Sequence, residues 1–302
     1  MKLLNFGSCN IDNVYSLENI VKSGETVSTY SLELFAGGKG LNQSIAAAKA
    51  GMSVFHAGCI GKDGAMLSSL LCESGVNITH LKVLDSERTG HAIIQVSRSG
   101  ENCILLYGGA NLKVEKDFID KVLEEFSEED ILLLQNEISS VDHLVEKAYA
   151  KGMTVVLNPS PFNEAIEKID ISKLSYLILN EHEASALCQK TEPSEIRDEL
   201  ISRYPKLRVV LTLGKSGAVY FDAESSVYHP AFCVEAVDTT AAGDTFTGYF
   251  LASVADGLSP YEALATASAA SALAITKKGA APSIPLSKDV YAAKKYLKPL
   301  EI

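Results

Sequence analysis

The chain has 302 residues, of which 27 are Lys or Arg and 38 are Asp or Glu, so its formal net charge is −11 at pH 7. This acidic balance, without a basic run longer than two lysines, excludes a surface that grips nucleic acid through its phosphates and disfavours binding to an anionic membrane. The composition, 47% hydrophobic and 22% charged, excludes a disordered chain and suits one large α/β domain.

Three features lead us to expect a cytoplasmic protein. The longest uncharged apolar stretch, residues 263–276, is shorter than the roughly 18 residues that cross a bilayer and predicts a packed helix. The first residues enter a strand-like segment without the basic and apolar blocks of a signal peptide. The six cysteines, at positions 9, 59, 72, 103, 188 and 233, form no C-x-x-C pair and predict neither a disulfide framework nor a zinc site.

Short apolar runs alternate with helical patterns along most of the chain. The apolar runs predict buried parallel strands at residues 3–8, 54–60, 131–135, 154–158, 175–180 and 208–214. The segments between them predict helices, among them residues 41–50, 65–73, 115–125, 141–151 and 193–203. This alternation predicts βαβ units in an α/β fold with a doubly wound, mostly parallel sheet flanked by helices.

Two regions break this rhythm and predict a small β lid. Residues 27–34 alternate in polarity, and residues 90–97 and 102–108 flank a hairpin-like turn. Half-buried antiparallel strands inserted early in an α/β chain suggest a lid over the carboxyl ends of the main strands, built from about 11–36 and 88–108. We expect a single domain, 1–302, because no linker rich in Pro, Gly or Ser and no internal repeat separates the lid from the rest.

Ligands of doubly wound sheets lie at the carboxyl ends of the strands, so polar residues that follow apolar runs are candidates for a site. Five such places occur: Cys9–Asp12, Gly37–Gln43, Gln135–Glu137, Asn180–Glu183 and Asp238–Asp244.

The first three of these places suit a polyhydroxylated ligand, although each has a simpler interpretation. Gly37–Gly40 is either a flexible turn or a donor-rich surface at the start of a helix that carries Asn42. Asn10 and Asp12 either cap a strand end or face the same way and hold vicinal hydroxyl groups. Glu137 by itself is only an acid at a strand end.

The segment 239–244 is the sharpest chemical signal. Small residues followed by Gly243 and Asp244, and then by an apolar helical run, place N–H groups at a helix amino terminus. These groups can stabilise negative charge on a transferring phosphoryl group, and Asp244 can take a hydroxyl proton. The alternative is that Asp244 is simply a first-turn carboxylate that satisfies the helix dipole.

The turn 212–217 resembles the tail of a P-loop, but a P-loop is excluded. The first glycine of that motif would stand at Val209, inside a strand, and the following residues 218–222 are strand-like. The turn is either a plain hairpin or a glycine-rich surface for a nucleotide. The chain also has no G-x-G-x-x-G motif, which removes the simplest case for a dinucleotide enzyme.

Together these motifs resemble the ribokinase family of carbohydrate kinases, in order and spacing along essentially the whole chain. Two signatures carry most of the resemblance: Gly37-Gly38-Lys39-Gly40-Leu41-Asn42-Gln43 and Asp238-Thr239-Thr240-Ala241-Ala242-Gly243-Asp244-Thr245-Phe246. Shorter matches are Asn10-Ile11-Asp12, Gly100-Glu101-Asn102, Gly109-Ala110-Asn111, Leu157-Asn158-Pro159 and Lys278-Gly279-Ala280 with Pro282-Ser283.

The resemblance implies a role for each matching residue. The sugar hydroxyls would be bound by Asn10, Asp12, Gly38, Lys39, Gly40, Asn42, Glu137 and Asp244. An apolar wall against the sugar would be formed by Ala92, Ile94 and Leu106 of the lid. Asp244 would be the catalytic base, and the anion hole would be the N–H groups of Ala241, Ala242 and Gly243.

The resemblance implies three cofactors, ATP, Mg²⁺ and K⁺. ATP would be contacted by Asn180, Thr212, Leu213, Gly214, Lys215, Ser216, Gly217, Gly243 and Ser268. Glu183 would be linked to magnesium indirectly. A monovalent cation would be held by Asp238, Thr240, Ala274, Lys277, Gly279 and Ser283.

The activity implied is ATP-dependent phosphorylation of D-ribose at its 5-hydroxyl, by a homodimer paired through its lids. Atypical residues at Leu41, His91, Gln95 and Ser268 keep a second hypothesis open, a kinase of the same family for deoxyribose, a ketohexose or a nucleoside. A third hypothesis is a catalytically silent sugar-binding or regulatory protein, against which the intact Asp244 and Gly243 speak.

Overall fold

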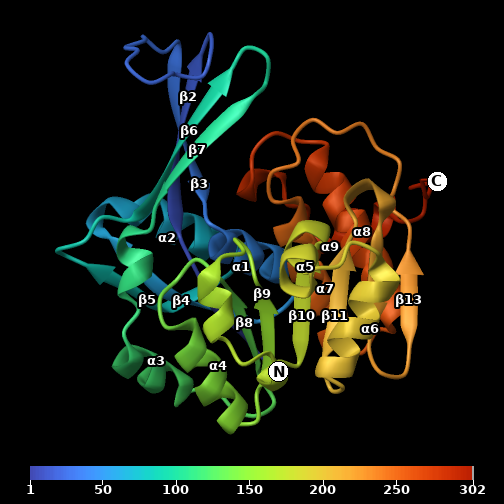
Figure 1. The fold of residues 1–302 in the computed structure, drawn as a ribbon. Coiled ribbons are helices and arrows are strands. Elements are labelled where there is room, and N and C mark those ends of the chain that lie inside the picture. The colour runs from blue at the N-terminus through green and yellow to red at the C-terminus, as the bar shows by residue number, and fades with distance from the viewer. Residues whose placement is uncertain (301–302) are drawn as a thin grey trace.

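The protein is described by a computed structural model, which covers residues 1–300. Its centre is a nine-stranded sheet with the order β13-β12-β11-β10-β9-β8-β1-β4-β5 (Figure 1). The strands are β1 (Leu3–Phe6), β4 (Val54–Gly61), β5 (Asn77–Leu84), β8 (Ile131–Gln135), β9 (Thr154–Asn158), β10 (Tyr176–Asn180), β11 (Arg208–Thr212), β12 (Ala218–Phe221) and β13 (Ser226–His229). In this order, the strands from β5 to β11 are parallel to one another. β12 pairs antiparallel with β11, and β13 pairs antiparallel with β12.

The predicted parallel strands are confirmed, with ends that differ by at most two residues. β5 and β13 were not predicted, because both are edge strands without an apolar run: most residues of β5 are partly or fully exposed, and β13 has only four residues. The strand pair β11 and β12 joined by a short turn confirms that residues 212–217 form no P-loop, since no helix follows the turn.

Helices cover both faces of the sheet. One face carries α1 (Lys39–Ala50), α2 (Ala65–Glu73), α7 (Ala242–Ala255), α8 (Pro260–Ile275) and α9 (Ser287–Ala293), and the other carries α3 (Lys116–Leu123), α4 (Val141–Ala150), α5 (Glu181–Cys188) and α6 (Pro193–Arg203). Short 3₁₀ helices are η1 (Lys62–Gly64), η2 (Gly109–Lys113), η3 (Glu164–Lys168), η4 (Ile171–Lys173), η5 (Gly214–Ser216) and η6 (Ala281–Ser283).

Alternation along the strands builds two cores from one sheet. In β1, Leu3 packs into the core under α1, α7 and α8, whereas its neighbour Leu4 packs into the core under α3 and α4. β8 divides in the same way, with Leu133 on one side and Leu132 on the other. The fold is therefore the doubly wound α/β sheet that the apolar runs predict.

The apolar segment 263–276 is part of the packed helix α8. Ser259 and Glu262 close a capping box at its start, with Pro260 in the first turn. Its small Ala and Ser side chains let α7 approach closely, which buries most of the helix. No helix within residues 1–300 is long and apolar enough to span a membrane.

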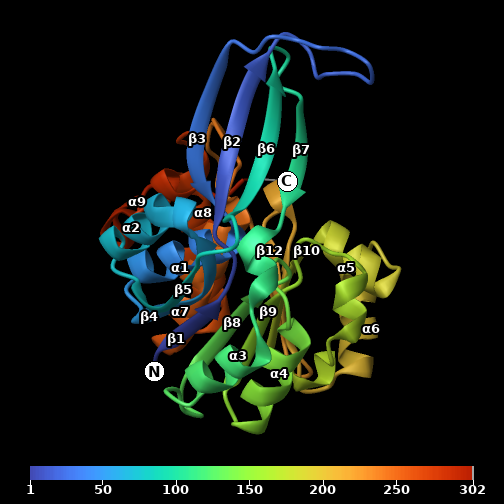
Figure 2. The same ribbon diagram turned by 90° about the vertical axis from the view of Figure 1, so that its left-hand side faces the viewer.

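A second sheet of four strands, which we call the lid, stands away from the main sheet (Figures 1 and 2). Its order is β3-β2-β6-β7, with β2 (Asn10–Leu17), β3 (Ser31–Gly37), β6 (Gly90–Ser97) and β7 (Asn102–Tyr107). The expectation of purely antiparallel lid strands was wrong, because β2 pairs with β6 in parallel. A tight turn forces β6 and β7 to be antiparallel, whereas the long connection between β2 and β6 leaves their direction free. The polarity pattern at residues 27–34 also misplaced a strand, which begins only at Ser31.

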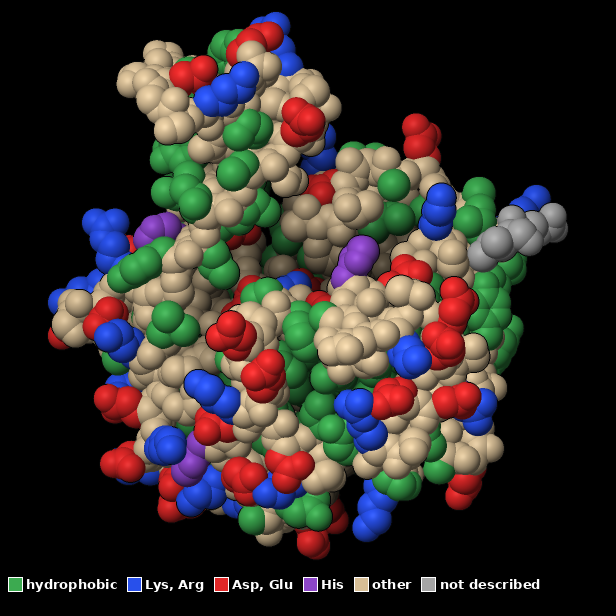
Figure 3. All heavy atoms as spheres, viewed as in Figure 1, with side chains coloured by type: hydrophobic (Ala, Val, Ile, Leu, Met, Phe, Trp, Pro, Cys, Tyr) green, Lys and Arg blue, Asp and Glu red, His purple; other side chains and the backbone are tan. Residues whose placement is uncertain are grey.

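The lid exposes many large apolar side chains to solvent. All residues of β7 are exposed, and the exposed fraction is 60% at Leu105 and 53% at Leu106. Leu32 and Leu34 of β3 are more than half exposed as well. Figure 3 shows hydrophobic side chains on the lid where it rises above the body.

Candidate active site

The two halves of the main sheet meet at β1, which lies between β8 and β4. The helix α4, which follows β8, covers one face of the sheet, and α2, which follows β4, covers the other. A crevice therefore opens at the carboxyl end of β1, where ligands of doubly wound folds bind. β2, the start of α1 and the residue that follows β8 by two positions all lie at this crevice. The topology thus brings the first three candidate segments to one place.

Helix α1 starts very close to the end of β1. Gly38 is its N-cap with φ 96°, and a Cβ there would lie 3.0 Å from the main-chain nitrogen of Asn10. At Gly40, a Cβ would lie 2.3 Å from the main-chain nitrogen of Ser8. Glycine is required at both positions because no side chain fits between these two segments.

Glu137 holds this helix start. Its Oε2 accepts a hydrogen bond from the main-chain N–H of Lys39 (2.9 Å) and another from the hydroxyl of Ser8. The N–H of Gly40 donates in turn to Oγ of Ser8 (3.2 Å). Burial raises the pKa of the Glu137 carboxyl, although the hydrogen bonds from Ser8 and Lys39 act in the opposite direction.

Asn10 and Asp12 follow on β2. The buried Asn10 accepts a hydrogen bond at Oδ1 from Nδ2 of Asn111 (2.7 Å), which fixes its amide. The carboxylate of Asp12 lies over Gly37, where a Cβ would come within 2.1 Å of Oδ2. Burial, and then the charge of Glu137, raise the pKa of Asp12 to about 6.

Lys39 provides a positive charge among three carboxylates. Burial disfavours its charged form, but Asp244, Glu137 and Glu183 outweigh burial, and the pKa of Lys39 is raised. The ammonium group therefore stays charged at the point where these acids converge.

Asp244 lies in the first turn of α7 and is 7% exposed. Its Oδ2 accepts a hydrogen bond from Nδ2 of Asn42 (3.0 Å), and its Oδ1 accepts one from Nε2 of Gln43 (2.8 Å). Ala241, the N-cap, has φ 59°, in the left-handed region that residues with a side chain rarely adopt. This turn points the first N–H groups of the helix towards the same space as Asp244.

The predicted anion hole is only partly open. The N–H of Ala242 donates to the carbonyl oxygen of Thr239 (3.2 Å). The N–H groups of Ala241, Gly243 and Asp244 have no hydrogen-bond partner within residues 1–300, as is usual at the start of a helix. These three groups, with the helix dipole, are the open donors for an anion here.

A polar pocket of about 250 Å³ surrounds these groups. Its lining includes Lys39, Glu183 and Asp244. Asn180 and Glu183 close a capping box at the start of α5, in which the N–H of Asn180 donates to Oε2 of Glu183 (3.0 Å). The pocket thus joins the start of α7 to the end of β10.

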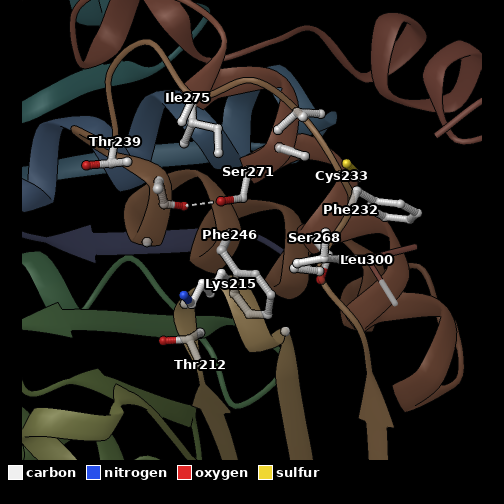
Figure 4. Close-up of a pocket in the computed structure, with 18 residues that line it drawn as sticks. Thr212, Lys215, Phe232, Cys233, Thr239, Phe246, Ser268, Ser271, Ile275 and Leu300 are labelled. Carbon is white, nitrogen blue, oxygen red and sulfur yellow. Dashed lines mark hydrogen bonds between the residues drawn. The ribbon is translucent and has the colours of Figure 1, made fainter. Parts of the chain in front are cut away.

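An apolar pocket of about 430 Å³ adjoins the polar one (Figure 4). The two pockets share Thr212, Thr239, Ala242 and Gly243. Figure 4 shows Thr212 and Lys215 at one end of the apolar pocket and Phe232 and Leu300 at the other. A planar apolar group fits such a pocket, with its polar part directed to the polar one.

The candidate nucleotide residues divide at this pocket. Those that line it are Thr212, Gly214, Lys215, Gly217, Gly243 and Ser268. Asn180 lines the polar pocket instead. Leu213 and Ser216 line neither: Leu213 packs against the core, and the carbonyl oxygen of Ser216 accepts a hydrogen bond from the hydroxyl of Tyr228 (2.9 Å).

Two of the candidate cation residues, Thr240 and Gly279, are hydrogen-bonded to the carboxylate of Asp238. Its Oδ1 accepts hydrogen bonds from the N–H of Thr240 (2.9 Å) and from the hydroxyl of that residue, and its Oδ2 accepts one from the N–H of Gly279 (2.9 Å). The N–H of Lys277 donates to the carbonyl oxygen of Ala274 (3.1 Å). The buried hydroxyl of Ser283 donates to the carbonyl oxygen of Ala280 (2.8 Å). The segment before α7 is therefore tied to the segment after α8.

Several residues at the site were not among the predicted ones. They are Ser8, Gln43, Asn111, Asn158, Ser160, Thr239 and Thr247 near the polar groups, and Phe232, Phe246, Ser271, Ile275 and Leu300 in the apolar pocket. Gln43 and Asn158 stand inside matching motifs, so the sequence held a signal for them. Phe232 and Leu300 carry no local pattern, and only the folded chain brings them together.

A doubly wound fold with a β lid and two adjoining pockets, one polar and one apolar, has room for a polar ligand and a nucleotide side by side, as a kinase of small molecules requires. The family model described as the pfkB family of carbohydrate kinases matches residues 1–286. The chain belongs to this family.

Several of its relatives are ribokinases, and a deoxyribokinase of Salmonella typhi is 30% identical over 94% of this chain and 96% of the relative. The chain is 35% identical to a ribokinase of Haemophilus influenzae over 291 residues, which cover 94% of this chain and 95% of the relative. Among solved structures, an Arabidopsis thaliana ribokinase complexed with ribose and ATP is similar with a TM-score of 0.88 and 30% identity, over 98% and 99% of the two chains. A ribokinase of Cryptococcus neoformans in complex with ADP is similar with a TM-score of 0.83 and 33% identity, over 96% and 99%.

Proposed function

We propose that this protein transfers the terminal phosphoryl group of ATP to the 5-hydroxyl of D-ribose. The observation that carries the proposal is the position of Asp244, which lies in the polar pocket at a helix start, beside Lys39 and next to the apolar pocket. The likeness to the ribokinase complexed with ribose and ATP supports the two substrates.

The sugar would be held between β2, the start of α1 and β8. Carboxylates and amides that are fixed by other contacts, such as Asp12 and Asn42, bind vicinal hydroxyl groups well because their orientation is set before the ligand arrives. Glu137 uses Oε2 for the helix start, so Oε1 is its atom for a sugar hydroxyl. Ala92, Ile94 and Leu106 on the lid would form the apolar wall.

Asp244 would accept the proton of the sugar hydroxyl as that oxygen attacks phosphorus. The open N–H groups at the start of α7, with the charge of Lys39, would stabilise the negative charge on the phosphoryl oxygens. The lid would exclude water, which otherwise competes with the sugar as an acceptor.

The two pockets fit ATP and Mg²⁺. The apolar pocket is lined by Phe246, Ile275 and Leu300, which would contact the nucleotide base of ATP. The residues shared by the two pockets would place the phosphates of ATP next to Gly243. Glu183 lines the polar pocket and is buried, and a carboxylate is the ligand type that Mg²⁺ prefers, directly or through water. When bound, Mg²⁺ supplies neutralising charge to the phosphates.

The segments around Asp238 also fit a monovalent cation such as K⁺. Asp238 supplies a carboxylate just before α7, and each of the candidate residues has a main-chain carbonyl group; oxygen atoms are the ligands that hard cations prefer. A bound cation would keep the residues 241–244 in place. The part of the site built by Asp238, Thr240, Ala274, Lys277, Gly279 and Ser283 would thus act by positioning the anion hole.

We infer further that the enzyme is a single-domain cytoplasmic protein, since it requires ATP, and that it is a homodimer. Support for the homodimer comes from the exposed apolar strand β7 at the edge of the lid. Sedimentation equilibrium of the protein with Leu105→Lys tests this contact, and a monomer at concentrations where the unaltered chain is a dimer is the expected result.

A coupled assay of ADP release tests the substrate. It compares ribose with 2-deoxyribose, fructose and adenosine at equal concentrations, with ATP, Mg²⁺ and K⁺ present. The highest kcat/KM for ribose is expected. A higher kcat/KM for another acceptor would show that the protein is a kinase of this family for a different substrate. If no acceptor causes release of ADP, the proposal is contradicted.

A further inference from the structure

A chain of buried amides runs from beneath the main sheet to Asp244. Nδ2 of Asn5 donates to Oγ of Ser44 (2.8 Å), and Oδ1 of Asn5 accepts from Nε2 of Gln135 (3.0 Å). The same nitrogen of Gln135 donates to Oε1 of Gln43 (2.7 Å). Nε2 of Gln43 then donates to Asp244 (2.8 Å). Asn5, Gln43 and Gln135 are each at most 1% exposed.

The direction of these hydrogen bonds is fixed at both ends by main-chain carbonyl groups. Nδ2 of Asn5 also donates to the carbonyl oxygen of Gly40 (2.8 Å), and a carbonyl can only accept. At the other end, Nε2 of Gln43 donates to Oδ1 of Asn158 (3.0 Å), whose Nδ2 donates to the carbonyl oxygen of Ile178 (2.8 Å). Each amide is therefore held in one of its two possible orientations.

The fixed orientation of the Gln135 amide leaves one of its atoms without a hydrogen bond. Its Oε1 is buried without a hydrogen-bond partner, because both hydrogens of its nitrogen serve the chain. A Cβ on Gly7 would lie 2.6 Å from this oxygen, so the glycine gives the amide its room. An unpaired buried oxygen is unfavourable, and rotating the amide would be worse, since its oxygen would then face two acceptors.

We propose that Gln43 is a positioning residue for the catalytic base, and that Gln135 keeps Gln43 turned with its N–H groups towards Asp244. The amide chain presents only donors to Asp244, and these hydrogen bonds hold the carboxylate in one rotamer. The inference rests on the proposed role of Asp244 as the base.

Gln43 acts through Asp244 and has no place in the ligand pockets. It is fully buried and lines neither the polar nor the apolar pocket. Its neighbour Asn42 differs, because its Oδ1 is buried without a partner and is free to accept from a ligand. Removing the amide of Gln43 should therefore lower kcat and leave substrate affinity nearly unchanged.

The experiment measures kcat and KM for both substrates from pH 5 to 9 in Gln43→Met, Gln43→Glu and Gln135→Met. For Gln43→Met we expect kcat to fall about tenfold or more, because a hydrogen bond to a charged group is lost, with KM values within about threefold. Gln135→Met should lower kcat by less, because Gln43 keeps its amide and loses only the contact that orients it.

Gln43→Glu distinguishes the effect of the hydrogen-bond donor of Gln43 from the effect of its side-chain volume. The new carboxyl can donate to Asp244 only while it is protonated, so kcat of this variant should fall as the pH rises, whereas Gln43→Met introduces no titrating group and should not show this fall. Equal pH profiles in the two variants and the unaltered enzyme, or a loss confined to KM, would overturn the proposal.

Two further variants serve as controls. Thr266→Val removes a buried hydroxyl on α8 that donates to the carbonyl oxygen of Glu262 (2.9 Å), far along the chain from the amides, and reports the effect of losing a buried polar group. Its pH profile should stay that of the unaltered enzyme. Asp244→Asn tests the base itself, and full turnover in this variant would refute the proposed function. If Asp244→Asn is inactive but the Gln43 variants have the kinetics of the unaltered enzyme, only the role of the amide chain is refuted.

Discussion

The carboxylate of Glu137 accepts a hydrogen bond from the main-chain N–H of Lys39 across 2.9 Å. This contact binds the end of β8 to the start of α1, and the hydroxyl of Ser8 completes it. Glu137 therefore shapes the proposed sugar site as well as belonging to it. Three of the groups proposed to bind the sugar depend on this arrangement, because Gly38, Lys39 and Gly40 form that helix start.

Ser8→Ala tests the helix start. The change removes one hydrogen bond to Glu137 and the acceptor for the N–H of Gly40, so Lys39 should be held less firmly. We expect KM for ribose to rise several-fold, by the order of one lost hydrogen bond, with a smaller change in kcat. Steady-state kinetics measures both. Ser68→Ala, on the exposed side of α2, is the control and should not change either value.

The raised pKa of Asp12 predicts that KM for ribose depends on pH. The carboxyl has a pKa of about 6, so it is ionised and accepts hydroxyl hydrogens above that value, and it becomes protonated as the pH falls through it. KM should therefore rise as the pH is lowered from 7 to 5. Asp12→Asn should have a high KM throughout this range with a flatter profile. An equally steep rise in that variant would assign the dependence to Glu137 instead.

Asp244→Asn should lower kcat by at least about a hundredfold, because it removes a general base. The amide still occupies the position of the carboxylate, so binding of ribose should survive. Isothermal titration calorimetry with ribose checks the binding, and the ADP assay checks the rate. Loss of both together would mean that Asp244 acts mainly on affinity.

Replacing K⁺ by Na⁺ at constant ionic strength should reduce the rate, if a monovalent cation holds the segment before α7. In Asp238→Ala, the ties to Thr240 and Gly279 are lost, and the rate should be low and the same in both salts. Tetramethylammonium chloride provides the reference without a bound cation. Equal rates of the unaltered enzyme in K⁺, Na⁺ and this reference would show that the cation is not needed.

The position of Leu300 predicts that the last residues that the structure describes contribute to nucleotide binding. Its N–H donates to the carbonyl oxygen of Ala231 (2.7 Å), and its side chain lines the apolar pocket. Leu300→Ala should raise KM for ATP several-fold and leave KM for ribose unchanged, because it removes apolar contact area only from the proposed base site. Leu286→Ala, an exposed leucine outside both pockets, is the matched control.

Much of the fold follows from local patterns. Strands β8 and β9 lie at the predicted residues because a run of apolar side chains bounded by polar ones can be buried on both faces only in the middle of a sheet. The edge strands β5 and β13 escaped prediction because half of an edge is in water and the pattern is weak. The direction of β2 against β6 was misjudged because pairing across a long connection leaves no local mark.

The candidate site divides in the same way. The glycine-rich start of α1 and the start of α7 with Asp244 could be predicted from local sequence, because tight approach and helix ends need particular residues at fixed spacing. Which groups meet there depends on how the chain folds. Gln43 and Asp244 are 201 residues apart, and Leu300 joins a pocket wall formed by other segments. A buried polar group must find a partner, but packing alone determines which segment of the chain supplies it.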